Sequence, residues 1–160
     1  MKIIKEIENI LKNQNFEIIS SDFKRPWGGF IVIDENQSEK FFNFFFRSSY
    51  LKKIDFKSKL SPKILIIKPN KRLSWQYHNR RSEMWKVCNG EIDVITSNDD
   101  TERKIQTLNK GDNIKIFQGE RHRIIGKDSY GIVAEIWLHS DKNYLSDEDD
   151  IVRVQDDYGR

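Results

Sequence analysis

Hydrophobic and polar positions follow a helical period only at the beginning of the chain. Apolar residues recur there every three or four positions, with Lys and Glu between them: Ile3, Ile4, Ile7, Ile10 and Leu11. Residues three and four apart lie on one face of a helix, so this pattern predicts an amphipathic N-terminal α-helix.

After this helix the pattern changes to short runs rich in β-branched and aromatic residues, separated by turn residues. The runs cover residues 16–19, 29–33, 40–46, 63–68, 73–78, 84–88, 91–96, 103–108, 113–117, 122–125 and 132–138. Many short strands at close spacing predict an all-β sandwich or barrel. Asn89-Gly90, between two of the runs, is the strongest local signal for a β-hairpin. No repeat or low-complexity linker divides the chain, so we expect a single domain.

One run, residues 40–46, carries five phenylalanines: Phe41, Phe42, Phe44, Phe45 and Phe46. We interpret this run as a buried strand or an interface edge, because aromatic side chains bury large areas. Such an apolar excess on one strand of a small barrel with open edges favours a homodimer. The core of a monomer would show the same pattern.

Composition narrows the class of protein. The 160 residues suit one domain, and 12% aromatic residues exclude a disordered chain. The 28 Lys and Arg nearly cancel the 25 Asp and Glu, so no nucleic-acid partner is expected. No apolar run approaches the ~20 residues that cross a bilayer, so no membrane partner is expected either. The N-terminus does not resemble a signal peptide and Cys88 is the single cysteine, which together predict a cytoplasmic protein.

The chain has only three histidines, and two of them stand among other metal-ligand residues. Gln76 and His78 are two apart on a predicted strand and therefore project to the same side. Glu83 joins them if the chain bends after His78, and His122 follows a glycine turn. Two imidazoles, a carboxylate and an amide oxygen suit Zn²⁺, Fe²⁺, Mn²⁺ or Ni²⁺. Taken singly, each is more often a hydrogen-bonded structural residue.

As a set, these residues have the spacing of two sequence motifs. The first reads Asn70, five residues, Gln76-Tyr77-His78, four residues, Glu83, six residues, Gly90; the second reads Gly111, five residues, Phe117-Gln118-Gly119, two residues, His122, three residues, Gly126. This frame resembles the cupin superfamily, although the consensus has other residues at the positions of Asn70, Gln76, Phe117 and Gly126. The resemblance implies a cupin-type double-stranded β-helix, a jelly-roll barrel, with one divalent metal.

A glutamine at the first ligand position is similar to the phosphomannose isomerases. Five blocks resemble the C-terminal type II phosphomannose isomerase (mannose-6-phosphate isomerase) domain: Arg25-Pro26-Trp27-Gly28, Leu73-Ser74-Trp75-Gln76-Tyr77-His78, Arg81-Ser82-Glu83-Met84-Trp85, Gly119-Glu120-Arg121-His122-Arg123, and the tail from Glu148 to Arg160. The blocks divide residues 1–160 into an N-terminal helix and extension (1–24) and the barrel with its tail (25–160). The resemblance implies a metal held by Gln76, His78, Glu83 and His122, zinc first.

The same resemblance implies a sugar-phosphate substrate, with conversion of mannose 6-phosphate to fructose 6-phosphate. Two histidines of the family are replaced here by Arg80 and Met84. The family is usually fused to an upstream nucleotidyltransferase, for which this chain is too short and lacks a Gly-rich loop, so guanylyltransferase activity is not expected. An aldose–ketose isomerase moves a proton between C1 and C2 through an enediolate, whose charge a divalent metal stabilises.

The isomerase also needs a general base and a phosphate-binding cation. Glu135 is the candidate base, with a structural carboxylate as the equal alternative. If Gln76 and His78 face inward, strand parity places Ser74 and Arg80 on the same side. Arg121 and Arg123 flank an inward His122 and are expected to face outward by the same parity. Arg153 and Arg160 belong to the tail, which is expected to fold back over the mouth of the barrel. Ser74, Arg80 and Arg153 are therefore the candidate substrate-binding residues, against surface ion pairs as the alternative for each arginine.

Three functions remain in competition. The first is a metal-dependent sugar-phosphate isomerase. The second is a non-catalytic metal-binding cupin that binds a sugar phosphate or a nucleotide sugar, which Arg80 in place of histidine favours. The third is another cupin enzyme such as an iron oxygenase, which Gln76 disfavours because oxygenases more often use three histidines and a carboxylate.

Overall fold

The computed structural model describes residues 2–47 and 54–160. In chain order its helices and strands are α1 (Lys2–Asn13), β1 (Ile18–Arg25), β2 (Gly28–Ile33), a 3-10 turn (Glu35–Gln37), α2 (Ser38–Phe45), β3 (Lys63–Ile67), β4 (Trp75–Tyr77), β5 (Arg81–Asn89), β6 (Glu91–Ser97), β7 (Lys104–Asn109), β8 (Asn113–Ile116), β9 (Arg121–Gly126), β10 (Gly131–His139) and β11 (Val152–Gln155). Within the described ranges, neither α-helix has the length and apolar character to span a membrane.

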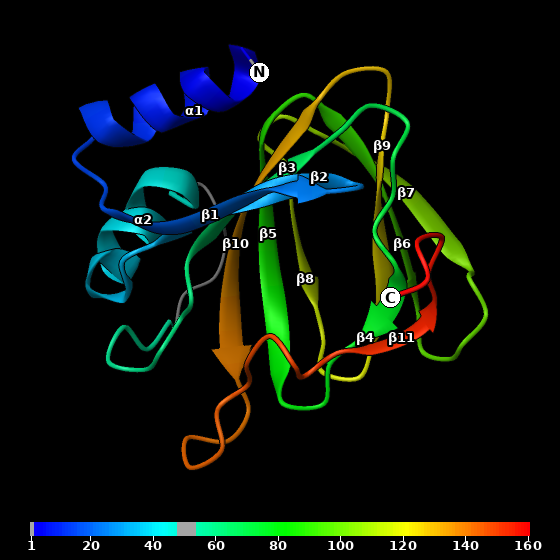
Figure 1. Ribbon diagram of the computed structural model, residues 1–160. Coiled ribbons are helices and arrows are strands. Elements are labelled where there is room, and N and C mark those ends of the chain that lie inside the picture. The colour runs from blue at the N-terminus through cyan, green and yellow to red at the C-terminus, as the bar shows by residue number, and fades with distance from the viewer. Residues whose placement is uncertain (1, 48–53) are drawn as a thin grey trace.

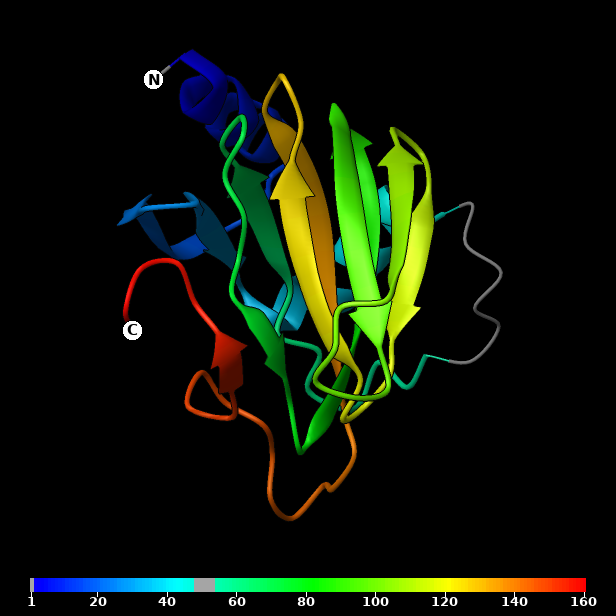
Figure 2. The same ribbon diagram turned by 90° about the vertical axis from the view of Figure 1, so that its right-hand side faces the viewer.

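The strands form two antiparallel sheets. One has the order β1-β2-β3-β10-β5-β8 and the other β11-β4-β9-β6-β7. The sheets face each other around a common interior, and α1 and α2 lie outside the six-stranded sheet (Figures 1 and 2). The predicted all-β jelly-roll barrel with an N-terminal helix is therefore confirmed.

In the six-stranded sheet the central strands β3 and β10 are buried on both faces, which explains their nearly continuous apolar sequences. On β3, Ile64 and Ile66 pack under the helices, whereas Leu65 and Ile67 pack in the barrel interior. Successive side chains on a strand point to opposite faces, so a doubly covered strand is apolar at every position. The same alternation directs Lys63, at the start of β3, into the interior.

The interpretation of residues 40–46 as a strand is wrong, because this segment belongs to helix α2. The ring centroids of Phe41 and Phe45 lie 4.6 Å apart, and those of Phe42 and Phe46 lie 5.3 Å apart. These are contacts between residues four apart on a helix. Phe41 and Phe46 are buried within the chain. The apolar strand edge therefore no longer supports a homodimer, and the homodimer stays a prediction.

Asn89-Gly90 forms a turn, but the predicted hairpin is wrong. Strand β5 before the turn and β6 after it belong to different sheets. Gly90 has φ of 73°, and a Cβ there would lie 2.2 Å from the carbonyl oxygen of Tyr130. Only glycine accepts this conformation and this close approach, so the residue serves a corner between the sheets.

The C-terminal tail returns to the barrel as β11, which pairs with β4 (Figure 1). Arg123 helps to hold the tail there. Its side chain faces outward, as parity predicted, yet it is 1% exposed because β11 covers it. The guanidinium donates to the main-chain oxygen of Leu73 and pairs with Glu102 and Gln155. Arg123 was expected to form a surface ion pair, whereas its ion pair is buried and its hydrogen bonds connect the tail to the barrel.

Candidate metal centre

A cavity of about 470 Å³ opens into the barrel between the two sheets. Gln76 and His78 come from β4 and the turn that follows it, Glu83 from β5, and Glu135 from β10. His122 comes from β9, where it is the cross-strand partner of Gln76. Gln76, His78, Glu83 and Glu135 line this cavity, and His122 is buried against His78 and Glu83.

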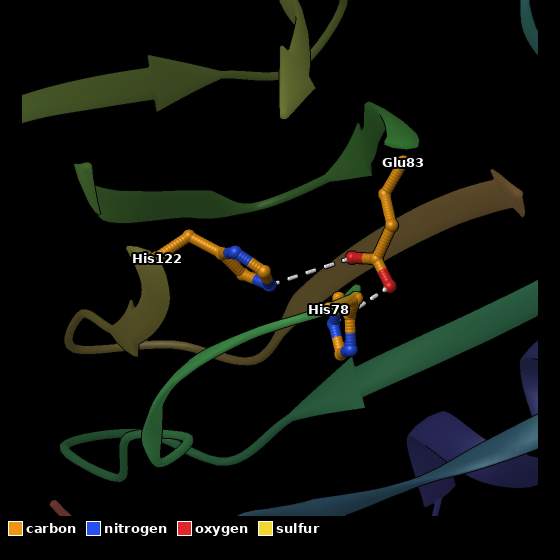
Figure 3. A group of neighbouring side chains, drawn as sticks. All are labelled: His78, Glu83 and His122. Carbon is orange, nitrogen blue, oxygen red and sulfur yellow. Dashed lines mark ion pairs between the residues drawn. The ribbon is translucent and has the colours of Figure 1, made fainter. Parts of the chain in front are cut away.

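His78, Glu83 and His122 bring their ligand atoms within 4.8 Å of one another (Figure 3). Nε2 of His78 lies 3.1 Å from Oε1 of Glu83, and Nε2 of His122 lies 3.6 Å from Oε2. All three side chains are buried. Two imidazoles and one carboxylate at this separation match the ligand set of a divalent transition metal.

Main-chain oxygens fix the orientation of both imidazole rings. Nδ1 of His78 lies 2.6 Å from the carbonyl oxygen of Asp150, and Nδ1 of His122 lies 2.8 Å from that of Glu120. Because a carbonyl oxygen only accepts, each Nδ1 carries the hydrogen and each Nε2 is directed at Glu83. Metal-binding histidines are commonly held in this way by their second nitrogen.

The charges in this group also fit a bound cation. Burial lowers the pKa of His122 to about 4, so its ring is neutral near pH 7. Its Nε2 is buried and has no hydrogen-bond partner in the described part of the chain. Burial by itself would raise the pKa of Glu83, but His78 and Arg81 hold that pKa well below its ordinary value. A metal ion bound between them would coordinate the unpartnered nitrogen of His122 and neutralise the carboxylate of Glu83.

Gln76, the fourth predicted ligand, lines the same cavity. Its Oε1 accepts a hydrogen bond of 2.7 Å from the hydroxyl group of Ser74. Ser74 was expected to contact substrate; in this structure it orients the amide of Gln76.

A family model described as the mannose-6-phosphate isomerase C-terminal domain matches residues 46–156. The chain belongs to this family. It is 30% identical over 136 residues to the xanthan biosynthesis protein XanB of Xanthomonas campestris pv. campestris, covering 85% of this chain and 23% of XanB. It is 36% identical over 107 residues to the alginate biosynthesis protein AlgA of Pseudomonas aeruginosa, covering 67% of this chain and 21% of AlgA. The chain thus spans about a quarter or less of these relatives.

Solved structures confirm the cupin fold. Vicilin from Solanum lycopersicum aligns with a TM-score of 0.53 and 20% identity, covering 79% of this chain and 32% of vicilin. The Drosophila melanogaster CENP-C cupin domain aligns with a TM-score of 0.51 and 18% identity, covering 74% of this chain and 76% of that domain. At these identities the likeness shows the fold alone.

Arg81 is the principal residue of the site that the sequence reasoning missed. Its Nε donates a hydrogen bond of 2.8 Å to Oε1 of Glu83, and its Nη2 lies 3.2 Å from Nε2 of His78. The guanidinium packs 3.7 Å from the centroid of the Trp137 ring and donates to Ser146. The residue stands in one of the family-like blocks, but strand parity favoured its neighbour.

The prediction that Arg80 faces the metal is wrong. Strand β4 ends at Tyr77, and the main-chain amides of Asn79 and Arg80 turn to donate to the carboxylate of Asp150. The alternation counted from β4 therefore does not reach position 80. The Arg80 guanidinium lies outside the cavity, 4.0 Å from the ring centroid of Tyr144 and paired with the carboxylate of residue 147.

We expect Arg81→Ala to lower the free energy of unfolding by about 3–5 kcal/mol, because it strands the buried carboxylate of Glu83. Arg80→Ala is the matched control and should cost under about 1 kcal/mol, the scale of a partly exposed ion pair. Urea denaturation of both variants measures the difference. Equal losses in the two variants would contradict the assignment of these arginines.

Glu135 lies in the cavity with its carboxylate held by two tryptophans. The indole nitrogens of Trp85 and Trp137 each donate to it over 2.9 Å. Burial, followed by the negative charge of Glu83, raises the pKa of Glu135 to about 7. A carboxylate with this pKa exchanges a proton readily near neutral pH.

Cations line the cavity near its mouth, where the tail crosses. Arg153, on β11, is the cross-strand partner of Gln76 and lines the cavity, as does Arg160. Arg160 also forms an ion pair with Asp156. Arg121 instead pairs with Asp100, the surface ion pair that was its alternative. Of the predicted substrate residues, the structure thus brings Ser74 and Arg153 to the cavity and leaves Arg80 outside.

Proposed function

We propose that this protein is a metal-dependent aldose–ketose isomerase acting on a sugar phosphate, with mannose 6-phosphate and fructose 6-phosphate as the first pair to test. One observation carries the proposal. His78 and Glu83, which belong to a buried set of metal-ligand atoms, line the same cavity as a separate carboxyl group with a pKa of about 7, that of Glu135. Isomerisation at C1 and C2 requires these two elements, charge stabilisation and a proton carrier.

His78, Glu83 and His122 would hold the metal, and the amide oxygen of Gln76 would be the fourth ligand. This donor set suits Zn²⁺ first, with Fe²⁺, Mn²⁺ and Ni²⁺ as alternatives. A bound divalent ion would stabilise the negative charge that develops on the two substrate oxygens. The fixed Nε2 orientation of both histidines means that the ligands need little rearrangement.

Glu135 would carry the proton between C1 and C2. Its two indole hydrogen bonds hold one carboxylate orientation, so the group is positioned before substrate binds. Both tryptophans are themselves buried, which fixes the positions of their indole nitrogens. Arg153, at the mouth of the cavity, would bind the phosphate through its planar guanidinium.

The comparisons support the substrate class. The family is described by the isomerisation of mannose 6-phosphate, and a further relative from Salmonella montevideo, 25% identical over 159 residues, is named a mannose-1-phosphate guanylyltransferase. This chain covers 27% of that relative. Mannose phosphates are therefore the substrates we propose, while nucleotidyl transfer is not part of the proposal.

A non-catalytic sugar-phosphate-binding protein is the second candidate. The contact of Arg81 with Glu83 and His78 favours it, because a guanidinium already neutralises the carboxylate that a metal would need. The two candidates differ in turnover. Both predict binding of a sugar phosphate.

We expect turnover of mannose 6-phosphate by metal-loaded protein, loss of turnover after chelation, and recovery when a divalent ion is restored. The physical reason is that charge on the enediolate is unstable without a nearby cation. A coupled assay for fructose 6-phosphate, repeated over a panel of sugar phosphates, measures this. Fully metal-loaded protein that binds sugar phosphates and turns over none of them would support the binding protein instead.

A further inference from the structure

Lys63 places a buried cation in the cavity, apart from the proposed metal ligands. It lies on β3 directly across from Glu135 on β10, and its side chain is 7% exposed. The ammonium nitrogen lies 4.0 Å from the ring centroid of Trp137 and 5.7 Å from that of Phe30. A lysine is rarely buried to this extent without an anion beside it.

Glu148 supplies that anion from the tail. Its carboxylate forms an ion pair with the ammonium of Lys63. Across residues 2–47 and 54–160, no other carboxylate forms an ion pair with this lysine. Glu148 belongs to a turn between β10 and β11, and its side chain is 70% exposed. The pair thus joins a buried cation of the barrel to an exposed acid of the tail.

The two partners differ in what separation would cost them. Glu148 would regain water at once, since most of its side chain is already exposed. Lys63 would be left buried without an ion pair, with the carboxyl group of Glu135 on the neighbouring strand as its remaining electrostatic attraction, which is unfavourable. Separation is therefore favoured when another anion takes the place of the Glu148 carboxylate.

We propose that Lys63 binds the phosphate group of the ligand together with Arg153, which lines the same cavity, and that Glu148 occupies the position at Lys63 until the phosphate displaces it. A phosphate carries more negative charge than a carboxylate and three acceptor oxygens, so it competes well for a buried ammonium. The displaced Glu148 side chain returns to solvent, while Asp150 nearby keeps its contacts with residues 78–80. The sugar-phosphate identity of the ligand rests on the proposed function, whereas the exchange of anions at Lys63 does not.

The test is calorimetric titration of the full chain with inorganic phosphate at constant ionic strength. Glu148→Gln should tighten the Kd by about three- to tenfold, because it removes the competing anion. Lys63→Met should weaken it more than about tenfold, and the double variant should behave like Lys63→Met alone. Asp149→Asn is the matched control: this residue also lines the cavity and carries the same charge, but it forms no ion pair with Lys63.

A second measurement guards against misfolding of the Lys63 variant. In the unmodified chain, phosphate should increase hydrogen exchange in the turn that contains Glu148, because the side chain of Glu148 no longer ties the turn to Lys63. Equal effects of Glu148→Gln and Asp149→Asn would overturn the proposal by showing a general charge effect. Unchanged exchange in that turn at saturating phosphate would overturn it as well. Either result can occur with or without isomerase turnover, so the two proposals fail separately.

Discussion

His122→Ala is expected to reduce bound divalent metal from about one ion per chain by more than tenfold, and His78→Ala to do the same. Each variant removes an imidazole whose Nε2 is directed at the carboxylate of Glu83. Elemental analysis of protein that has been stripped with a chelator, reloaded with Zn²⁺ and dialysed measures the loss. Zn²⁺ should also raise the Tm of the unmodified protein and leave that of each variant unchanged.

His139→Ala is the control for these variants. It is the third histidine of the chain, and its Nδ1 accepts a hydrogen bond from the main chain of Ser146 rather than joining the ligand set. It should retain full metal content. Full occupancy in the double variant of His78 and His122 would refute the assignment of the metal ligands.

Glu135→Gln is expected to lower kcat by about 10²–10⁴-fold while KM changes little, because it removes the proton carrier and keeps the shape of the side chain. In the unmodified enzyme, kcat should rise with pH through about 7, where this carboxyl ionises. Initial rates across the pH range measure both effects. If Glu135→Gln turns over substrate at the rate of the unmodified enzyme, Glu135 is a structural carboxylate and not the proton carrier.

The stability of Glu135→Gln checks the environment of the carboxylate independently of activity. The pKa of Glu135 is raised from 4.5 to about 7 in the folded protein. An acid whose pKa is higher in the folded state than in the unfolded state stabilises the fold at pH values below its unfolded pKa. This stability is lost as the pH rises through the folded pKa. Relative to the unmodified chain, Glu135→Gln should therefore be more stable at about pH 8 than at about pH 4. The same offset at both pH values would contradict the shift.

Much of the barrel could be predicted from the sequence because strand-forming runs and turn residues alternate along it. The segment 40–46 could not, since consecutive phenylalanines suit a buried strand and a buried helix face equally. Packing of α2 on the outer face of the sheet decides between them. The exposed strand β11 was also missed, because Val-Arg-Val-Gln alternates over only four residues and all four are exposed.

The cluster of His78, Glu83 and His122 could be predicted because the spacing of these residues follows the family frame. The neighbouring charges could not, because their positions depend on where strands end. A turn held by Asp150 separates β4 from β5. As a result Arg81, and not Arg80, contacts Glu83. Likewise, the tail acid Glu148 reaches Lys63 across 85 residues of sequence, a contact that no local pattern indicates.

The most direct test of the proposed isomerase is deuterium exchange at the substrate carbon atoms. Metal-loaded protein is incubated with mannose 6-phosphate in D₂O, and proton NMR follows the signals at C1 and C2. A proton carrier such as Glu135 exchanges with solvent, so deuterium should enter the sugar phosphate, and chelation or Glu135→Gln should stop it. Absence of both deuterium and fructose 6-phosphate, with metal and substrate shown to be bound, would contradict an isomerase.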